Sequence, residues 1–449
     1  MLDASLLDKL IPQTQSDIIV QIIDRICGAG KTSEMIAGLD HIRRYLIVTP
    51  LLEDVQDIIN RSDVLLTQPE ARPELRGSDA SRIAHTKRGH LYDLLMGGDS
   101  VVTTHALYND IAWAAREGLL TGYDIIIDEV PKTSDVLSSG PKNTAGDKIN
   151  SLVWKNQYLR DGYAEIAENK QVVPTQKWAN DVARQENTLS KTLYAQAEAG
   201  CLWTAGETVL VWELPSVLLS VGRSCTVMTY RFNGSLLQAF MMKHGIGYAV
   251  NAGRETELAE EEARLRAKAK ELITLKGIAG IGNMKLTAGA MDPAKLTKAQ
   301  QTKIVNALKK LRGKDLKGAV AGSVLVTCLK GLWFEGGNSD KSQPGPICKA
   351  GRKTTGLFSL CRWSANVTRG TNAFRDCDTV IYFYDKNLNP GVANTLGVSA
   401  QGNFNELYAV SEMVQFIYRS CLRNGEPVTI YMPSARMRTL LQAWLDGDI

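Results

Sequence analysis

Residues 25–38 read RICGAGKTSEMIAG, a glycine-rich bend that joins an apolar run to a helical pattern. Glycines let the backbone fold back, so that several N–H groups can converge on phosphate oxygens. The complete phosphate-loop pattern also has a Gly five places before Gly30, and Arg25 occupies that place. The remaining GxGKT motif, Gly28–Thr32, predicts a nucleotide-phosphate site if other parts of the chain supply its partners.

Each polar group of this loop has a predicted role. The Lys31 ammonium would reach the β- and γ-phosphates of ATP as a point charge, and the Thr32 hydroxyl would bind Mg²⁺. The helix that follows would direct the positive end of its dipole at the same anion. The predicted nucleotide-binding residues are Gly28, Ala29, Gly30, Lys31, Thr32 and Ser33.

The run YDIIIDEVPK, Tyr123–Lys132, supplies the acidic groups that such a site requires. Three isoleucines form the buried part of a predicted strand, and Asp128 and Glu129 stand side by side at its end. Mg²⁺ takes oxygen ligands, and Asp128 suits its shell, usually through water. Glu129 suits the activation of an attacking water. The GxGKT motif and this acidic strand end together predict hydrolysis of a nucleotide.

Short apolar runs alternate with helical patterns, which is typical of a parallel sheet covered by helices. The predicted strands of the first half lie within 16–26, 45–50, 100–105, 123–130 and 224–230. A second α/β pattern has predicted strands within 322–328, 378–384 and 426–432. We therefore predict an α/β protein of two domains, residues 1–231 and 232–449.

Two segments interrupt this alternation. Residues 136–222 are polar with helical stretches, which predicts a mainly helical insertion in the first domain. Residues 255–318 have a charged helical pattern that becomes strongly basic toward its end. A solvated helical face is the simpler interpretation of that basic segment, and a contact with nucleic acid is the alternative.

The composition sets limits on the class of protein. The net charge of +4 permits a polyanionic partner but does not require one. The eight cysteines form no CxxC pair and no zinc-spaced Cys/His set, which indicates free thiols in a reducing cytoplasm. Residues 1–15 do not resemble a signal peptide, and no apolar run approaches the ~20 residues of a membrane span. We expect a cytoplasmic protein without a membrane partner.

The motifs, in their order along most of the chain, resemble those of superfamily 2 helicases and translocases. CGAGKTS resembles motif I of that family, and DEVP, Asp128–Pro131, stands where the family has DEAD, DEAH or DExx. Val227–Tyr230, VMTY, stands where motif III reads SAT or TAT, so that only Thr229 matches. The motif sequences are most similar to those of helicases from bacteriophages and large viruses. A phage origin would imply that the protein acts in the host cytoplasm.

Two segments of the second domain strengthen the resemblance. Ser364–Phe383 resembles motif V, with Asn372 in place of the usual Asp, which implies that Gly370 and Asn372 contact the nucleotide. Gln415–Ser434 resembles motif VI. The resemblance implies two RecA-like domains with ATP and Mg²⁺ between them, and an arginine that reaches the γ-phosphate from the second domain. The implied catalytic residues are Lys31, Asp128, Glu129, Gln415, Arg419 and Arg423, of which Arg419 matches the family's spacing better than Arg423.

The same resemblance implies a nucleic-acid partner, single-stranded or forked DNA with RNA as an option, and further replication or recombination partners. Strand binding uses hydroxyls, backbone N–H groups and a few cations. Some of the implied contacts are threonines. Threonine is β-branched and common in strands for packing reasons alone, so packing is the alternative interpretation of these residues. The implied contacts lie at or near strand ends and are Thr49, Pro50, Thr104, His105, Thr327 and Thr368.

Two other functions fit parts of the chain. The motor of a viral DNA-packaging terminase also has a phosphate loop and an Asp-Glu strand end. It would carry a nuclease domain with clustered carboxylates, and Asp376, Asp378 and Asp385 are the nearest set. A nucleic-acid-binding protein with a decayed ATPase site would explain Arg25 and the unusual motif III. The presence of Lys31 and the Asp-Glu pair argues against such decay.

Overall fold

The computed structural model describes residues 18–75, 84–140, 148–334, 345, 361–366, 372–399 and 402–449. Its first lobe is built on six parallel strands in the order β13-β1-β12-β4-β2-β3. All five strands predicted for this half are present, which confirms the helix-covered parallel sheet. The strands are β1 (Val20–Asp24), β2 (Arg44–Thr49), β3 (Val101–Thr104), β4 (Tyr123–Asp128), β12 (Ser224–Thr229) and β13 (Tyr248–Val250).

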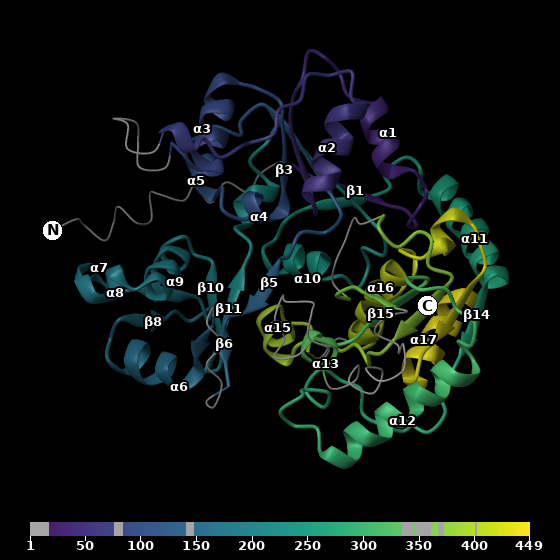
Figure 1. Cartoon of the computed structure of the whole chain (residues 1–449). Helices are drawn as coiled ribbons and strands as arrows, with labels where there is room; N and C mark the ends of the chain where they lie inside the picture. The colour runs from purple at the N-terminus through teal and green to yellow at the C-terminus, as the bar shows by residue number, and fades with distance from the viewer. Residues whose placement is uncertain are drawn as a thin grey trace.

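Both faces of this sheet are buried. In β2, Leu46 and Val48 pack into one apolar core, whereas Tyr45 and Ile47 pack into another. Successive side chains of a strand point to opposite faces, so a sheet covered on both sides reads as a continuous apolar run. The helices of the first lobe are α1 (Lys31–Ala37), α2 (Leu52–Arg61), α3 (Lys87–Gly97), α4 (His105–Tyr108), α5 (Ala112–Arg116) and α10 (Leu236–Lys243) (Figure 1).

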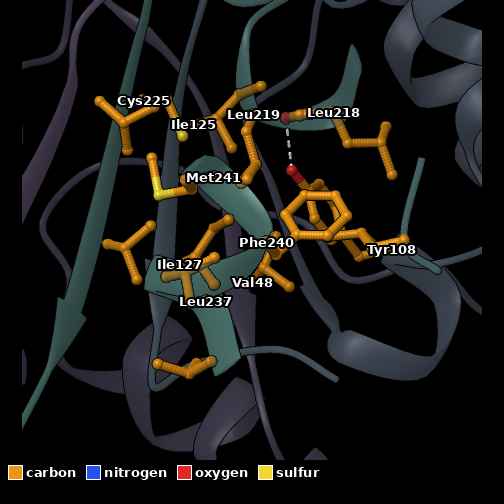
Figure 2. Close-up of a cluster of buried hydrophobic side chains, with 14 of the residues drawn as sticks. Val48, Tyr108, Ile125, Ile127, Leu218, Leu219, Cys225, Leu237, Phe240 and Met241 are labelled. Carbon is orange, nitrogen blue, oxygen red and sulfur yellow. Dashed lines mark hydrogen bonds between the residues drawn. The ribbon is translucent and has the colours of Figure 1, made fainter. Parts of the chain in front are cut away.

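The larger of these two cores joins segments that lie far apart in the sequence. Figure 2 shows Ile125 and Ile127 of β4 among Leu237, Phe240 and Met241 of α10. The hydroxyl of the fully buried Tyr108 donates a hydrogen bond of 2.6 Å to the carbonyl of Leu218. A buried phenol needs such a partner, because an unsatisfied donor in an apolar core costs about 1–3 kcal/mol.

The insertion leaves the first sheet after β4 and returns to it at β12. It has an apolar core of its own, in which Trp154 and Trp178 flank Tyr158. Helices are present as predicted, but the three-stranded antiparallel sheet β10-β11-β5 was not foreseen. The elements are β5 (Ser134–Val136), β6 (Ser138–Ser139), β7 (Ile149–Asn150), α6 (Ser151–Val153), a π-helix (Trp154–Arg160), β8 (Ala164–Ile166), β9 (Val172–Pro174), α7 (Gln176–Asn180), α8 (Val182–Glu186), α9 (Thr188–Glu198), β10 (Leu202–Ala205) and β11 (Val209–Glu213).

The second lobe is built on five parallel strands in the order β14-β18-β17-β15-β16. The three strands predicted for this half are β15 (Val324–Thr327), β17 (Thr379–Tyr382) and β18 (Val428–Tyr431). The strands β14 (Ile273–Lys276) and β16 (Cys361–Trp363) complete the sheet. Its helices include α11 (Glu255–Leu272), α12 (Lys298–Lys314), α13 (Lys330–Trp333), α15 (Pro390–Thr395), α16 (Phe404–Ile417) and α17 (Ala435–Asp446).

Two predicted boundaries differ from the structure. The first sheet does not end at residue 231, because α10 follows that point and β13 then pairs with β1. The predicted helical segment 255–318 is two helices, α11 and α12, separated by the edge strand β14. β14 has a half-buried pattern, so its sequence lacks the continuous apolar run of the central strands.

Two expectations from composition concern the whole chain. The seven cysteines in the described ranges are free thiols, as expected, and Cys348 lies outside those ranges. Among the helices that the structure describes, none combines the length and the apolar composition that crossing a membrane requires.

Candidate active site

The glycine-rich loop lies between the end of β1 and the start of α1. Gly28 and Gly30 have φ angles of 84° and 81°, in the left-handed region that residues with a side chain adopt only at a cost. A Cβ atom on Gly28 would also lie 3.6 Å from Cγ of Arg423. The two glycines are therefore required by the turn, and the second lobe lies directly against it.

The loop and the acidic strand end meet as predicted. The Thr32 hydroxyl donates a hydrogen bond of 3.0 Å to Oδ2 of Asp128. The buried Lys31 ammonium lies across the loop, where it donates to the Arg25 carbonyl at 2.8 Å and to that of Ile26 at 3.4 Å. Burial, with a contribution from Glu129, raises the pKa of Asp128 to about 6. A hydroxyl and a carboxylate are hard oxygen ligands, so these two residues fit the Mg²⁺ that accompanies nucleotide phosphates.

Glu129 has an unusual backbone at the end of β4. Its φ of 63° is left-handed, and its N–H donates to the Met228 carbonyl at 2.8 Å. Left-handed backbone at a non-glycine residue costs of order 1–3 kcal/mol and is found most often at functional sites. The imidazole Nε2 of His105 lies 2.9 Å from the Asp128 carbonyl, so the end of β3 contacts the same strand end. The strained backbone makes Glu129 a candidate for a functional role, independently of the sequence motif.

A cavity of about 250 Å³ lies between the two lobes and contains these groups. Its wall combines the phosphate loop of the first lobe with Arg419 and Arg423, the two arginines of the motif VI-like segment. Gly370 and Thr368 lie outside the described residues. The first lobe contributes Cys27, Gly28, Gly30, Lys31, Thr32, Ser33, Asp54, Asp57, Ile58, Arg61, Asp128 and Glu129, and the second contributes Asn372, Arg375, Gln415, Tyr418, Arg419 and Arg423.

The two motif VI arginines are held differently. Arg419 is only 5% exposed, and its guanidinium donates to the carbonyls of Ala365 and Asn366 at 3.0 and 3.3 Å. Arg423 is exposed, and its positive charge counteracts the rise in the pKa of Asp128. Of the two arginines, Arg423 is therefore the one whose charge is accessible to the cavity. The sequence resemblance favoured Arg419, which the structure holds against the backbone of the second lobe.

Charged residues that the sequence analysis did not select also line the cavity. Arg61 of α2 donates to Asp57 and to the Ser33 hydroxyl, both at 2.7 Å. Burial, together with the charge of Asp128, raises the pKa of Asp54 to about 7. The spacing of these α2 residues places them on one helix face, which is the sequence signal for them. The residues not selected are Asp54, Asp57, Arg61 and Arg375.

Arg25, the residue that breaks the phosphate-loop pattern, joins the two lobes. Its guanidinium forms two 2.8 Å hydrogen bonds with the carboxylate of Glu261 on α11 and a further ion pair with Glu34 on α1. Arg25 is 8% exposed. A bidentate, largely buried pair of this kind has a defined geometry. Arg25 therefore fixes the phosphate loop relative to α11.

Tyr230 forms a second junction, at the end of β12. Its hydroxyl donates to Glu262 at 2.9 Å and accepts from the Trp444 indole at 2.7 Å. Its carbonyl accepts a 3.0 Å hydrogen bond from the Gln415 side chain. Thr229, the residue that matches motif III, is buried. Tyr230 is thus the residue of this segment that contacts the second lobe, and the motif comparison alone did not identify it.

Arg25→Gln and Glu261→Gln should each lower the thermal midpoint, whereas the double variant should lose no more than the more damaging single one. Each single variant removes the bidentate pair, although in Glu261→Gln Arg25 keeps its ion pair with Glu34, and the coupling energy should be about 1 kcal/mol or more. Scanning fluorimetry of the four proteins measures it. Lys132→Gln, which removes an exposed ion pair with Asp135, is the control and should change stability by less than about 0.5 kcal/mol. Additive losses would contradict the junction.

The predicted nucleic-acid contacts divide into two groups. Thr49 and Thr327 are fully buried, so these two hydroxyls do not lie at the surface and the prediction is corrected for them. Their positions in central strands explain the burial. Pro50, Thr104 and His105 are partly exposed at strand ends, and their role stays a prediction.

Comparison with solved structures identifies the class of fold. The two parallel sheets with a cavity between them form the two RecA-like lobes of a helicase-type α/β fold. A solved chain described as an XPD helicase matches with a TM-score of 0.51 and 14% identity, over 100% of this chain and 98% of that chain. The S. tokodaii protein Xpd4 matches with a TM-score of 0.44 and 13% identity, over 99% and 97% of the two chains. These likenesses concern the fold.

Two sequence comparisons find similarity to one protein and to one family model. The chain is 25% identical over 436 residues to the "SPbeta prophage-derived uncharacterized protein YonV" of Bacillus subtilis (strain 168), which covers 96% of this chain and 99% of the relative. A family model described as the YonV C-terminal Rossmann-like domain matches residues 267–445. That match begins within α11 and contains all five strands of the second sheet.

Proposed function

We propose that this protein is an ATP-dependent motor that moves along nucleic acid or unwinds it. The observation that carries the proposal is the cavity in which the GxGKT loop, Asp128 and Glu129 face Arg423 across the boundary between the lobes. A motor of this kind needs nucleotide to hold two lobes together and hydrolysis to release them, so the phosphates must be contacted from both sides.

The residues of the first lobe have distinct roles in this proposal. Backbone N–H groups of the loop and the Lys31 ammonium bind the phosphates. Thr32 and Asp128 hold Mg²⁺, which neutralises charge on the phosphate oxygens when it is bound. Glu129 orients a water for in-line attack and accepts its proton. Burial raises the pKa of Asp128 to about 6, and a bound cation would favour its ionised form further.

The second lobe responds to the nucleotide. Arg423 lies against the phosphate loop and can stabilise charge on the transferred phosphoryl group. Gln415 and Tyr230 connect α16 to the end of β12, and Arg25 connects the loop to α11. Loss of the γ-phosphate would change contacts on which these junctions depend, which is how hydrolysis would move one lobe against the other.

For its partner, we propose single-stranded or forked DNA, with RNA as the alternative track. The fold is that of helicases, and the relative from a prophage favours a bacteriophage role, such as replication, in the host cytoplasm. ATP hydrolysis measured with and without single-stranded DNA and RNA tests the proposal. Turnover should rise at least tenfold with one polymer and be lost in Lys31→Ala. Turnover that no polymer changes would reject a nucleic-acid motor.

The two alternatives have less support. In the described ranges no group of three or more His, Cys, Asp or Glu residues could hold a metal, and Asp376 and Asp385 pair with Arg362 and Arg436. A terminase-type nuclease centre needs clustered carboxylates instead. A decayed site would hydrolyse no ATP even in the presence of nucleic acid, so ATP turnover distinguishes the motor from a binding protein with a decayed site.

A further inference from the structure

A second cleft, of about 510 Å³, lies between the insertion and the second lobe. One wall is the turn between β8 and β9 with the end of β10, and the other is α15 with the residues that follow it. In the chain, the insertion follows the carboxyl end of β4, and α15 follows that of β17. Figure 1 shows α15 beside β11 and β5, and α15 also contacts β10. The cleft is therefore bordered by both halves of the chain, like the nucleotide cavity.

The described lining of this cleft has no carboxylate. It contains lysines, asparagines, threonines and glycines around one tryptophan, and its two cations are Lys170 and Lys243. Both oxygens of the fully buried Glu213 accept from the Lys243 ammonium, at 2.8 and 2.9 Å. The positive charge of Lys243 is thus neutralised by the Glu213 carboxylate. Lys170 is exposed, and its ammonium has no partner within the described part of the chain.

Lys170 has a strained backbone. Its φ is 74°, although the turn that it closes favours glycine or asparagine at such a position. The turn is nevertheless well held: the Lys170 N–H donates to the Ala167 carbonyl, and the Lys170 carbonyl accepts from the N–H of Thr204, both at 2.9 Å. Strained backbone of this kind clusters at ligand-binding and active sites, so the exposed Lys170 side chain is a candidate for a binding role.

Trp203, one of the residues that line the cleft, carries an unsatisfied donor. Trp203 is only 8% exposed, and its indole Nε1 is buried without a hydrogen-bond partner among the described residues. The Lys243 ammonium lies 3.4 Å from the centroid of the Trp203 ring and so helps to hold it in place. Asn169 and Asn394 border the same cleft and carry exposed side chains. Such groups bind phosphate, sugar and base edges without selecting a sequence.

We propose that this cleft binds a stretch of single-stranded nucleic acid, with a backbone phosphate on the Lys170 ammonium. The charge of the lining is complementary to a polyanion, and the bordering amides complement its sugars and bases. The proposal rests on the proposed function and extends it, because it gives the insertion a role in the motor. In that role the insertion holds the strand against the second lobe while the lobes move.

Lys170→Gly tests the proposal, since it removes the ammonium and relieves the left-handed backbone. Fluorescence anisotropy with a labelled single-stranded oligonucleotide should give an affinity about fivefold weaker at 0.1 M salt. The slope of log affinity against log salt should become less steep by about 0.7, the value for one phosphate contact on a single strand. Thermal stability should be unchanged or higher, because glycine suits this φ angle. Lys191→Ala, on the exposed side of α9, should alter neither the affinity for the oligonucleotide nor the salt slope.

Each contrary result has a distinct meaning. Unchanged affinity and salt slope in Lys170→Gly would overturn the cleft as a strand site and leave the proposed motor intact. Equal weakening for a duplex of the same length would overturn the assignment to a single strand. No binding of any strand by the native chain, with ATP turnover present, would reject the nucleic-acid partner and this inference with it.

Discussion

Replacing Arg423 with alanine is expected to lower kcat for ATP about 10³-fold, while the Kd for nucleotide changes by only a few fold. An arginine supplied from a second lobe acts mainly on charge that develops during phosphoryl transfer, and its removal costs 10³-fold or more. Arg423 is exposed and lies against Gly28, and within the described ranges no buried group depends on its side chain for a hydrogen bond. Steady-state turnover and titration with a fluorescent ATP analogue separate the two quantities.

Arg419→Ala provides the contrast. Arg419 donates to two carbonyls of the second lobe and stacks 4.8 Å from the centroid of the Phe416 ring, so its removal should destabilise that lobe by about 1–3 kcal/mol. Arg423→Lys should recover part of the lost turnover, because it restores the charge but not the planar donor geometry. If Arg419→Ala keeps native stability and loses more kcat than Arg423→Ala, the assignment of the two arginines is reversed.

The second large effect is expected at Glu129. Glu129→Gln keeps the shape and the backbone of the residue but removes the proton acceptor, so kcat should fall by about 10²–10⁴-fold. Nucleotide binding should persist, because the phosphate loop and the pair of Thr32 with Asp128 are unchanged. In the presence of ATP this variant should therefore accumulate in its nucleotide-bound form.

Single-turnover hydrolysis, in which enzyme exceeds ATP, measures the chemical step directly. Asp135→Asn changes a carboxylate near the start of the insertion that pairs with Lys132, and it serves as the matched control with native turnover. Turnover of Glu129→Gln within tenfold of the native rate would exclude Glu129 as the base. Asp54, whose pKa is raised to about 7 in the same cavity, would then be the next carboxylate to replace.

Much of the candidate site could be predicted because its chemistry is contiguous in the chain. The run CGAGKTS contains the loop, the lysine and the hydroxyl within seven residues, and DE follows directly on an apolar strand. The sequence could assign Arg419 and Arg423 to the site, but it could not decide which of the two has the accessible charge. The role of Arg419 depends on the backbone carbonyls of Ala365 and Asn366, which lie 54 and 53 positions earlier in the motif V-like segment, and a motif does not show which side chain its backbone will bind.

The amino-acid order alone was sufficient for the central strands of both sheets, because a strand buried on both faces must be apolar at every position. It was also sufficient for the phosphate loop, because glycine is required where the backbone turns left-handed. Tertiary packing decided the edge strands β13, β14 and β16 and the short strands of the insertion, which depend on neighbours rather than on their own composition. It also decided the burial of Thr49 and Thr327 and the pairing of Arg25 with Glu261, which is 236 positions away in the chain. Such contacts follow from the way the lobes fold onto each other, and no local pattern of residues encodes them.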